Sequence, residues 1–240
     1  MRRLAPRLSL VALLMVFVIS SHAQIDVTAK VALGNDAKGT KGRDTSDIVL
    51  WLTPAEGLAP SVALQPMQHP RLTQKDKSFE PHVLVVPVGT EVEFPNRDPF
   101  FHNVFSLFEG KRFDLGLYEA GSTREVLFDK PGISYIFCNI HAEMSAVVLA
   151  LGTPYYGISD RKGNVAIPHV PSGRYTLRVW YETATPEALA AMTREITVDR
   201  GTASLGLLRL PAPGVPLGHK NMYGKDYPPP KPGDPPYSKP

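Results

Sequence analysis

One stretch of seven residues limits what this chain can fold into more than any other: Cys138-Asn139-Ile140-His141-Ala142-Glu143-Met144. It carries a thiol, an imidazole and a thioether at a C-x2-H-x2-M spacing. A β-branched and aromatic run, Ile133 to Phe137, precedes it, and a second apolar run, Ala146 to Leu151, follows it. The sequence therefore predicts that these three side chains lie on a tight loop between two strands, where they can converge on one point.

A fourth candidate ligand, His102, lies upstream in the strand-like segment Phe100 to Val104. Two histidines, one cysteine and a weak methionine are the ligands of a blue-copper electron-transfer centre. The alternative is a buried core cysteine, with His141 on the surface and Met144 in the core. Three soft ligands so close together, with an upstream histidine, favour the metal site.

The N-terminus has the features of a secretory signal. Residues 1–7 are basic, residues 8–19 are almost all apolar, and Ser21-His22-Ala23 supplies small residues for cleavage. The apolar run is shorter than the roughly 20 residues that span a bilayer, so residues 1–23 are expected to be a cleaved signal peptide rather than an anchor. A periplasmic location follows. The chain has one cysteine, and a free thiol in an oxidising compartment is a liability unless it is buried or metal-bound.

The net charge argues against several classes of partner. The chain carries a formal charge of +3, and the predicted signal peptide contains Arg2, Arg3 and Arg7 but no acidic residue. Without these three, the 26 basic residues become 23, which equals the 23 acidic residues. The sequence therefore gives no case for a nucleic-acid partner or a polybasic membrane-binding patch, and the mature chain is expected to have no membrane span.

The fold class follows from short β-branched runs separated by glycine and proline. Only Pro186 to Thr193 has helical composition, so the mature chain is predicted to be all β. Turn signals about every eight to twelve residues are typical of a β-sandwich or barrel. Strands are expected at Ile25–Leu33, Ile48–Leu52, Val83–Thr90, Val92–Phe94, Phe113–Tyr118, Glu125–Phe128, Ile133–Phe137, Ala146–Leu151, within 159–167 and 170–180, and at Glu195–Val198 and Ser204–Leu210.

Residues 79–152 resemble a cupredoxin of the branch that contains plastocyanin, pseudoazurin and amicyanin. The gap of two residues between His141 and Met144 is similar to the short amicyanin loop. The wider chain resembles secreted plastocyanin-like proteins often labelled methylamine-utilisation proteins. The matching motifs are Val88-Gly89-Thr90, Phe94-Pro95-Asn96-Arg97-Asp98, His102-Asn103-Val104, Lys130-Pro131-Gly132 and Cys138 to Met144.

This resemblance implies a Greek-key cupredoxin β-sandwich over residues 65–152 that holds one copper ion, cycling between Cu(I) and Cu(II). His102, Cys138 and His141 would form the trigonal plane, with Met144 as the long axial ligand. Asn103 would be a second-sphere brace between the His102 strand and the cysteine loop, or else a turn-stabilising asparagine.

The other histidines are not expected to bind metal. His82 lies beside a proline at the start of a strand, while His69, His169 and His219 are predicted to be solvated. The chain has no H-x-H spacing of the kind that multicopper oxidases use, and no second cysteine for a binuclear centre. We therefore expect a one-electron carrier that is not an enzyme.

A different unit is predicted over residues 153–210. Its pattern, from Asp160 through Gly163 to Tyr175, resembles the carboxypeptidase regulatory-like (transthyretin-like) sandwich, which says little about function. The early hairpin of that fold would come from residues 24–64, so that the cupredoxin is inserted into the small sandwich. Two domains in series are the alternative. Residues 211–240 contain ten prolines and are predicted to be a disordered tail, with a partner-docking arm as the alternative.

The expected function is periplasmic electron transfer between redox proteins, such as a dehydrogenase or a c-type cytochrome. The competing hypothesis is a copper-handling or sensing protein whose second sandwich binds a protein or a glycan. His141 is predicted to be the electron port, with partners docking around it. Pro99, Phe100 and Phe101 would extend an apolar patch ringed by Arg97, Asp98 and Glu143, unless the second sandwich or the tail covers this end. The identity of the donor and acceptor and the reduction potential stay open.

Overall fold

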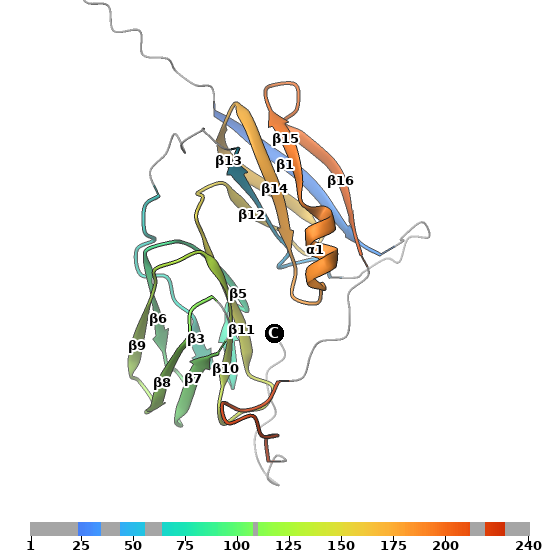
Figure 1. Cartoon of the computed structure of the whole chain (residues 1–240). Coiled ribbons are helices and arrows are strands. Elements are labelled where there is room, and N and C mark those ends of the chain that lie inside the picture. Colours follow the sequence, from blue (N-terminus) through green and yellow to red (C-terminus); the bar gives the residue numbers. More distant parts are fainter. Residues whose placement is uncertain (1–23, 35–43, 56–63, 108–109, 212–218, 229–240) are drawn as a thin grey trace, which may run out of the picture.

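The computed structural model describes residues 24–34, 44–55, 64–107, 110–211 and 219–228. The predicted signal peptide, residues 1–23, lies outside them. The described chain is nearly all β, as predicted, and forms two stacked β units (Figure 1). Helix α1 (Pro186–Met192) begins after Thr185, whose side-chain oxygen accepts a hydrogen bond from the Ala188 N–H, and it matches the helix predicted at this position. No helix among the described residues is long and apolar enough to cross a membrane.

The lower unit in Figure 1, residues 64–152, carries the predicted metal ligands and is called the ligand sandwich below. Its pairs are antiparallel except for β5 beside β11. The main sheet has the order β5 (Val83–Pro87), β11 (Ser145–Leu151), β10 (Gly132–Cys138), β7 (His102–Ser106), β8 (Phe113–Tyr118), and the smaller pairs are β6 (Thr90–Pro95) with β9 (Thr123–Phe128) and β3 (Thr73–Lys75) with β4 (Ser78–Glu80).

The core of the ligand sandwich lies between the main sheet and the β6–β9 pair. Alternate residues of β6 point inward, so that Val92 and Phe94 are fully buried while Glu91 is exposed. Cys138 and Met144 belong to this same buried apolar cluster. The two sulfur-bearing candidates are thus inside the sandwich.

The upper unit, called the second sandwich, is built from strands on both sides of the ligand sandwich in sequence. β1 and β2 precede residue 64, yet β1 pairs with β13 and β16, and β2 pairs with β12 and β14. Strands from before and after the ligand sandwich in the sequence therefore pair within one unit. The two sheets have the orders β13 (Asn164–Pro171), β1 (Gln24–Leu33), β16 (Ser204–Leu210) and β12 (Tyr156–Ile158), β2 (Val49–Pro54), β14 (Gly173–Trp180), β15 (Arg194–Val198).

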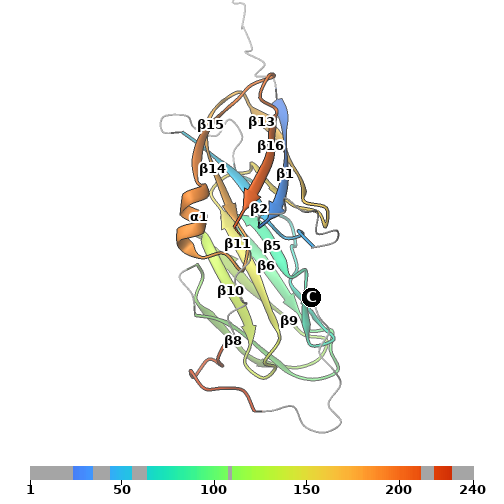
Figure 2. The same ribbon diagram turned by 90° about the vertical axis from the view of Figure 1, so that its right-hand side faces the viewer.

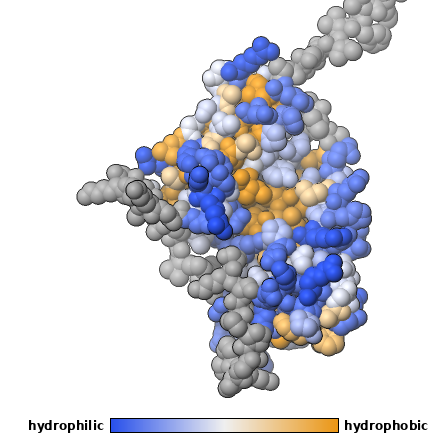
Figure 3. Space-filling view, turned by 180° about the vertical axis from the view of Figure 1, so that it is seen from behind, coloured by the Kyte–Doolittle hydropathy of each residue, from blue (hydrophilic) through white to orange (hydrophobic). Residues whose placement is uncertain are grey.

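The two sandwiches share a buried junction, which lies at mid-height in Figure 2. Side chains from β5 and β11 pack there with Val49 and Trp180 of the second sandwich, and Trp180 is 1% exposed. Seen from behind, hydrophobic residues also gather at mid-height on a largely hydrophilic surface (Figure 3). The junction covers the outer face of β5 and β11, opposite the face that packs in the core of the ligand sandwich.

Beside this junction lies a polar cluster of His82, Glu182 and Ser145, called the His82 clamp below. The Nε2 of His82 lies 2.7 Å from the Glu182 carboxylate, and its Nδ1 lies 3.2 Å from the Ser145 carbonyl oxygen. Because both ring nitrogens face oxygen acceptors, both contacts are hydrogen bonds only when the ring carries two protons. Burial lowers the pKa of His82, but the hydrogen bond and charge of Glu182 and the charge of Asp47 outweigh it, so the pKa is raised.

Candidate metal centre

The four predicted ligands lie at one end of the ligand sandwich, on β7, on β10 and on the turn between β10 and β11. His102 is the first residue of β7, and Cys138 is the last residue of the neighbouring strand β10, where it pairs with Val104. The chain then turns through residues 139–144 before β11 begins at Ser145. His141 and Met144 lie on this turn, so the predicted loop between two strands is present.

The donor atoms of three ligands converge. The Nδ1 atoms of His102 and His141 lie 3.5 and 3.4 Å from the Cys138 sulfur, and all three donors are within 4.8 Å of one another. Donors about 2.0–2.3 Å from a shared metal ion have edges of this length, so the cluster fits one ion. His102, Cys138 and Met144 are fully buried, whereas His141 is half-buried. A thiolate, two imidazoles and a neighbouring thioether suit copper.

Main-chain hydrogen bonds hold the ligand loop in shape. The Cys138 N–H donates to the Met144 carbonyl at 3.1 Å, and the Met144 N–H donates to the His141 carbonyl at 3.2 Å. The Asn139 N–H donates to the Asn103 carbonyl at 2.8 Å, which ties the loop to β7. Three ligands are therefore fixed relative to one another by the backbone itself.

The environment of Cys138 opposes ionisation of the free thiol. Burial raises its pKa, while backbone N–H groups of Asn103, Ile140 and His141 lower it by a smaller amount. Only the thiolate is a metal ligand, so the three N–H groups are placed to stabilise the ligating form of the sulfur.

Asn103 braces the site through its backbone, whereas its side chain serves the neighbouring strand. Its Nδ2 donates to the Asp114 carboxylate on β8 at 2.6 Å. Its Oδ1 is buried without a hydrogen-bond partner among the described residues. The predicted link from β7 to the cysteine loop is present, but the Asn103 carbonyl makes it rather than the amide side chain.

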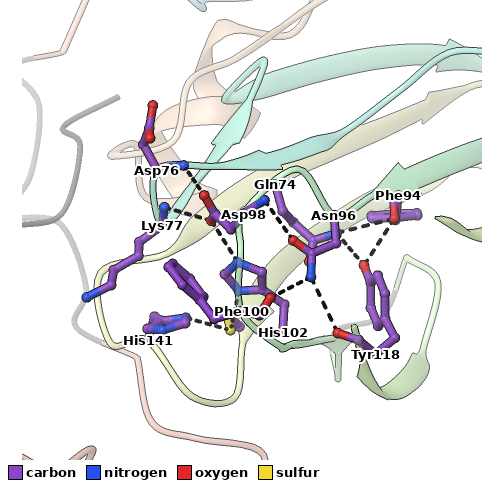
Figure 4. A network of polar contacts seen from close by, with 11 residues as sticks. Gln74, Asp76, Lys77, Phe94, Asn96, Asp98, Phe100, His102, Tyr118 and His141 are labelled. Atoms are coloured by element: carbon purple, nitrogen blue, oxygen red, sulfur yellow. Dashed lines mark hydrogen bonds and ion pairs between the residues drawn. The ribbon is translucent and has the colours of Figure 1, made fainter. Parts of the chain in front are cut away.

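Asp98 is a site residue whose role the sequence interpretation missed. It was expected in a charged rim, but it is 4% exposed and its Oδ2 lies 2.8 Å from the Nε2 of His102 (Figure 4). The backbone N–H groups of Asp76 and Lys77 donate to the same carboxylate at 2.6 and 3.0 Å. The prediction of a surface Asp98 is therefore wrong. The carboxylate holds the proton on Nε2 and leaves Nδ1 free to bind a metal.

Burial lowers the pKa of His102, and the hydrogen bond and charge of Asp98 only partly oppose this. The imidazole is therefore neutral near pH 7, which is the form that ligates a metal. The sequence does contain a signal for this pair: Asp98 lies in the predicted turn, four residues before the ligand His102.

The turn that leads into β7 is shaped by Asn96. Its Oδ1 accepts the Asp98 N–H at 3.0 Å, and its Nδ2 donates to the Phe100 carbonyl at 2.8 Å and the Tyr118 carbonyl at 3.4 Å. Asn96 is fully buried. One side chain therefore holds together the turn that was predicted at residues 96–99 and that delivers Asp98 and His102 to the site.

Phe100 packs against both imidazoles rather than standing on the outer surface. Its ring centroid lies 5.3 Å from that of His102 and 5.5 Å from that of His141, and the Lys77 ammonium lies 5.9 Å from it. Exposed apolar residues at this end include Phe101, which is 53% exposed, Ile140, which is 43% exposed, and Leu117, which lies opposite Asn103 and is 59% exposed. Phe101 of the predicted apolar patch is thus exposed, as is Ile140 beside His141, whereas Phe100 is half-buried; docking of a partner there stays a prediction.

Residues 219–228, called the strap below, pack against the end of β10. The His219 ring stacks on Phe137 with centroids 4.0 Å apart, and burial lowers the pKa of His219. The expectation that His219 is solvated is wrong, and the strap differs from the disordered tail predicted for residues 211–240. The remaining histidines, His69 and His169, are exposed.

Comparisons with known proteins give structural matches only. No protein-family model matches the sequence, and no curated protein matches it. A copper-containing nitrite reductase from Thermus scotoductus SA-01 is 28% identical over 39% of this chain and 25% of its own, with a TM-score of 0.34. This chain thus spans a quarter of that reductase.

Two smaller proteins are matched over more of their own length. A purple cupredoxin from Nitrosopumilus maritimus is 24% identical over 34% of this chain and 96% of its own, with a TM-score of 0.31. An oxidised amicyanin variant is 20% identical over 35% of this chain and 82% of its own, with a TM-score of 0.33.

Proposed function

We propose that this protein is a periplasmic blue-copper protein that carries single electrons between redox partners and has no catalytic activity of its own. The observation that carries this is the convergence of the Nδ1 atoms of His102 and His141 on the Cys138 sulfur. Copper bound there supplies a Cu(I)/Cu(II) couple. The protein supplies a compromise geometry in which the thiolate favours Cu(I), imidazole accepts both states and the thioether is a weak ligand that stabilises Cu(II) slightly compared with no ligand.

The rigidity of the site favours a carrier. Three backbone hydrogen bonds fix the ligand loop, and Asp98 fixes the ring of His102 from the other side. Little has to move when an electron arrives or leaves, which keeps the reorganisation energy low. A site that is meant to hand over its copper would instead need ligands that open readily.

His141 is the proposed electron port. His102 and Cys138 are fully buried, whereas His141 is half-buried and lies beside the exposed residues Ile140 and Phe101. Transient redox partners use small interfaces, below about 1,200 Å², with an apolar centre. We therefore propose that the donor and acceptor, such as a dehydrogenase or a c-type cytochrome, dock on this apolar face.

The competing proposal is a copper-handling or sensing protein that uses its second sandwich to bind a protein or a glycan. One observation favours it: β2, β14 and β15 line a polar cleft far from the ligands, with Arg174, Arg178 and Glu195 around it. The backbone hydrogen bonds of the ligand loop and the burial of His102, Cys138 and Met144 argue against copper delivery, so the carrier is the better supported function.

Two measurements on copper-loaded protein separate these functions. Cyclic voltammetry of a carrier gives a reversible one-electron wave, and transfer of copper to a competing chelator is slow. A copper-handling protein instead releases its metal quickly, without a stable reversible wave. Fast release together with an irreversible wave would refute the carrier proposal.

A further inference from the structure

The strap makes contacts with three consecutive residues at the end of the ligand strand. The Tyr227 hydroxyl donates to the Cys138 carbonyl at 2.8 Å, and the Met222 N–H donates to the Asn139 side-chain oxygen at 2.9 Å. His219 completes the set by stacking on Phe137. Each contact falls at the point where β10 ends and the ligand loop begins (Figure 1).

The strap also holds itself together around these contacts. The Tyr227 hydroxyl lies 3.3 Å from the His219 Nδ1, and the two rings are 5.2 Å apart in an edge-on arrangement. The Asn221 side chain accepts the N–H groups of Tyr223 and Lys225 at 3.0 Å each. Because the strap has its own internal hydrogen bonds, its contacts can restrain the strand end as one unit.

From these contacts we propose that the strap is a positioning element of the copper site, with Tyr227 as its key residue. The inference rests on the proposed function and adds residues to it. The Cys138 carbonyl is on the same residue as the thiolate ligand, so a donor bound to it restrains the main chain from which the sulfur projects. Met222 restrains Asn139, the first residue of the loop, in the same way.

The strap leaves the proposed port open while it closes the neighbouring flank. Phe137 is 8% exposed under the His219 ring, whereas Ile140 and Phe101 remain 43% and 53% exposed. Because neighbouring residues of a strand point to opposite faces, His219 covers the face of β10 opposite the Cys138 sulfur, and the strap restrains the strand end rather than covering the sulfur. Electrons are therefore exchanged beside His141 rather than through the end of β10.

The test uses the thiol itself, because Cys138 is the single cysteine of the chain. In metal-free full-length protein, Tyr227→Phe removes one hydroxyl and keeps the ring. It is expected to speed alkylation of Cys138 about fivefold, which corresponds to one hydrogen bond of ordinary strength. Tyr223→Phe is the matched control, since Tyr223 lies in the same segment and is 72% exposed, and it should leave the rate unchanged. A chain that ends at residue 218 lacks the whole strap, and its Cys138 should be alkylated faster than that of Tyr227→Phe.

A second readout separates positioning from simple shielding. The Tyr227 hydroxyl withdraws electron density from the Cys138 carbonyl, so its loss should stabilise Cu(II) and lower the reduction potential of copper-loaded protein. Tyr223→Phe should keep the parent potential. The proposal is overturned if Tyr227→Phe and the shortened chain match the parent in both measurements, or if Tyr223→Phe changes them as much.

Failure of the proposed function looks different. If copper-loaded parent protein gives no reversible wave while Tyr227→Phe still speeds alkylation of the metal-free thiol, the carrier function is wrong. The strap then still positions Cys138.

Discussion

The buried carboxylate of Asp98 provides a direct test of how the site is built. It accepts the backbone N–H groups of Asp76 and Lys77 and faces the Nε2 of His102, and it is 4% exposed. Asp98→Asn keeps the shape of the side chain but replaces one oxygen by an NH2 group. That group must face at least one of the three donors, so at least one hydrogen bond becomes a repulsive contact.

The expected cost follows from the strength of these bonds. A hydrogen bond to a charged group contributes about 1.5–3 kcal/mol, so losing one and weakening another should lower the free energy of unfolding by about 2–4 kcal/mol. This is a large part of the total of roughly 5–15 kcal/mol for a folded protein. The variant should also raise the reduction potential, because the lost negative charge stabilised Cu(II).

The stability of the ligand sandwich is measured by denaturant unfolding of metal-free protein, with the reactivity of the Cys138 thiol as the signal for unfolding. Asp76→Asn is the matched control, because the Asp76 side chain is 66% exposed and its ion pair with Lys75 is 3.9 Å long. Such a surface pair contributes about 0–1 kcal/mol. Equal stability of the Asp98→Asn and Asp76→Asn variants would refute the buried carboxylate as a brace.

Three further outcomes are expected. Met144→Leu should keep copper bound and raise the potential, on the order of the 59 mV that corresponds to a tenfold shift for one electron, as voltammetry would show. Ala142→Lys beside His141 should slow electron exchange with the partner about tenfold in stopped-flow experiments and leave the visible spectrum unchanged. The folded-state pKa of His82 is raised, so its pair with Glu182 in the His82 clamp stabilises the protein fully below the unfolded pKa of about 6.5. This stabilisation is lost as pH rises through the folded pKa of His82. In denaturant unfolding at a series of pH values, Glu182→Gln should therefore show a smaller fall in the free energy of unfolding as pH rises.

The parts of the structure that sequence patterns predicted are local ones. The loop from Cys138 to Met144 was predicted because β-branched runs on both sides mark its flanking strands, and β10 and β11 are those strands. The helix at Pro186 was predicted from the helical composition of Pro186 to Thr193, and the structure adds Thr185 as its N-cap. In these cases the neighbouring residues alone decide the backbone conformation.

The parts that were missed depend on contacts between distant segments. Asp98 was expected on the surface because most aspartates are solvated, but the backbone of Asp76 and Lys77 encloses its carboxylate. The strap was expected to be disordered because prolines around it cannot build a core. Its order comes from Tyr227 and His219, which bind to a strand end about 80 to 90 residues earlier in the chain.

The measurement that tests the central claim most directly is a titration of metal-free protein with Cu(II), detected by visible absorption. The Cys138→Ser variant is titrated in the same way as the control. The parent protein is expected to bind one copper and develop the intense thiolate-to-copper charge-transfer band, because His102, Cys138 and His141 converge on one point. The Cys138→Ser variant should stay colourless in this region. An intense blue band in Cys138→Ser, or its absence from fully loaded parent protein, would contradict the assignment.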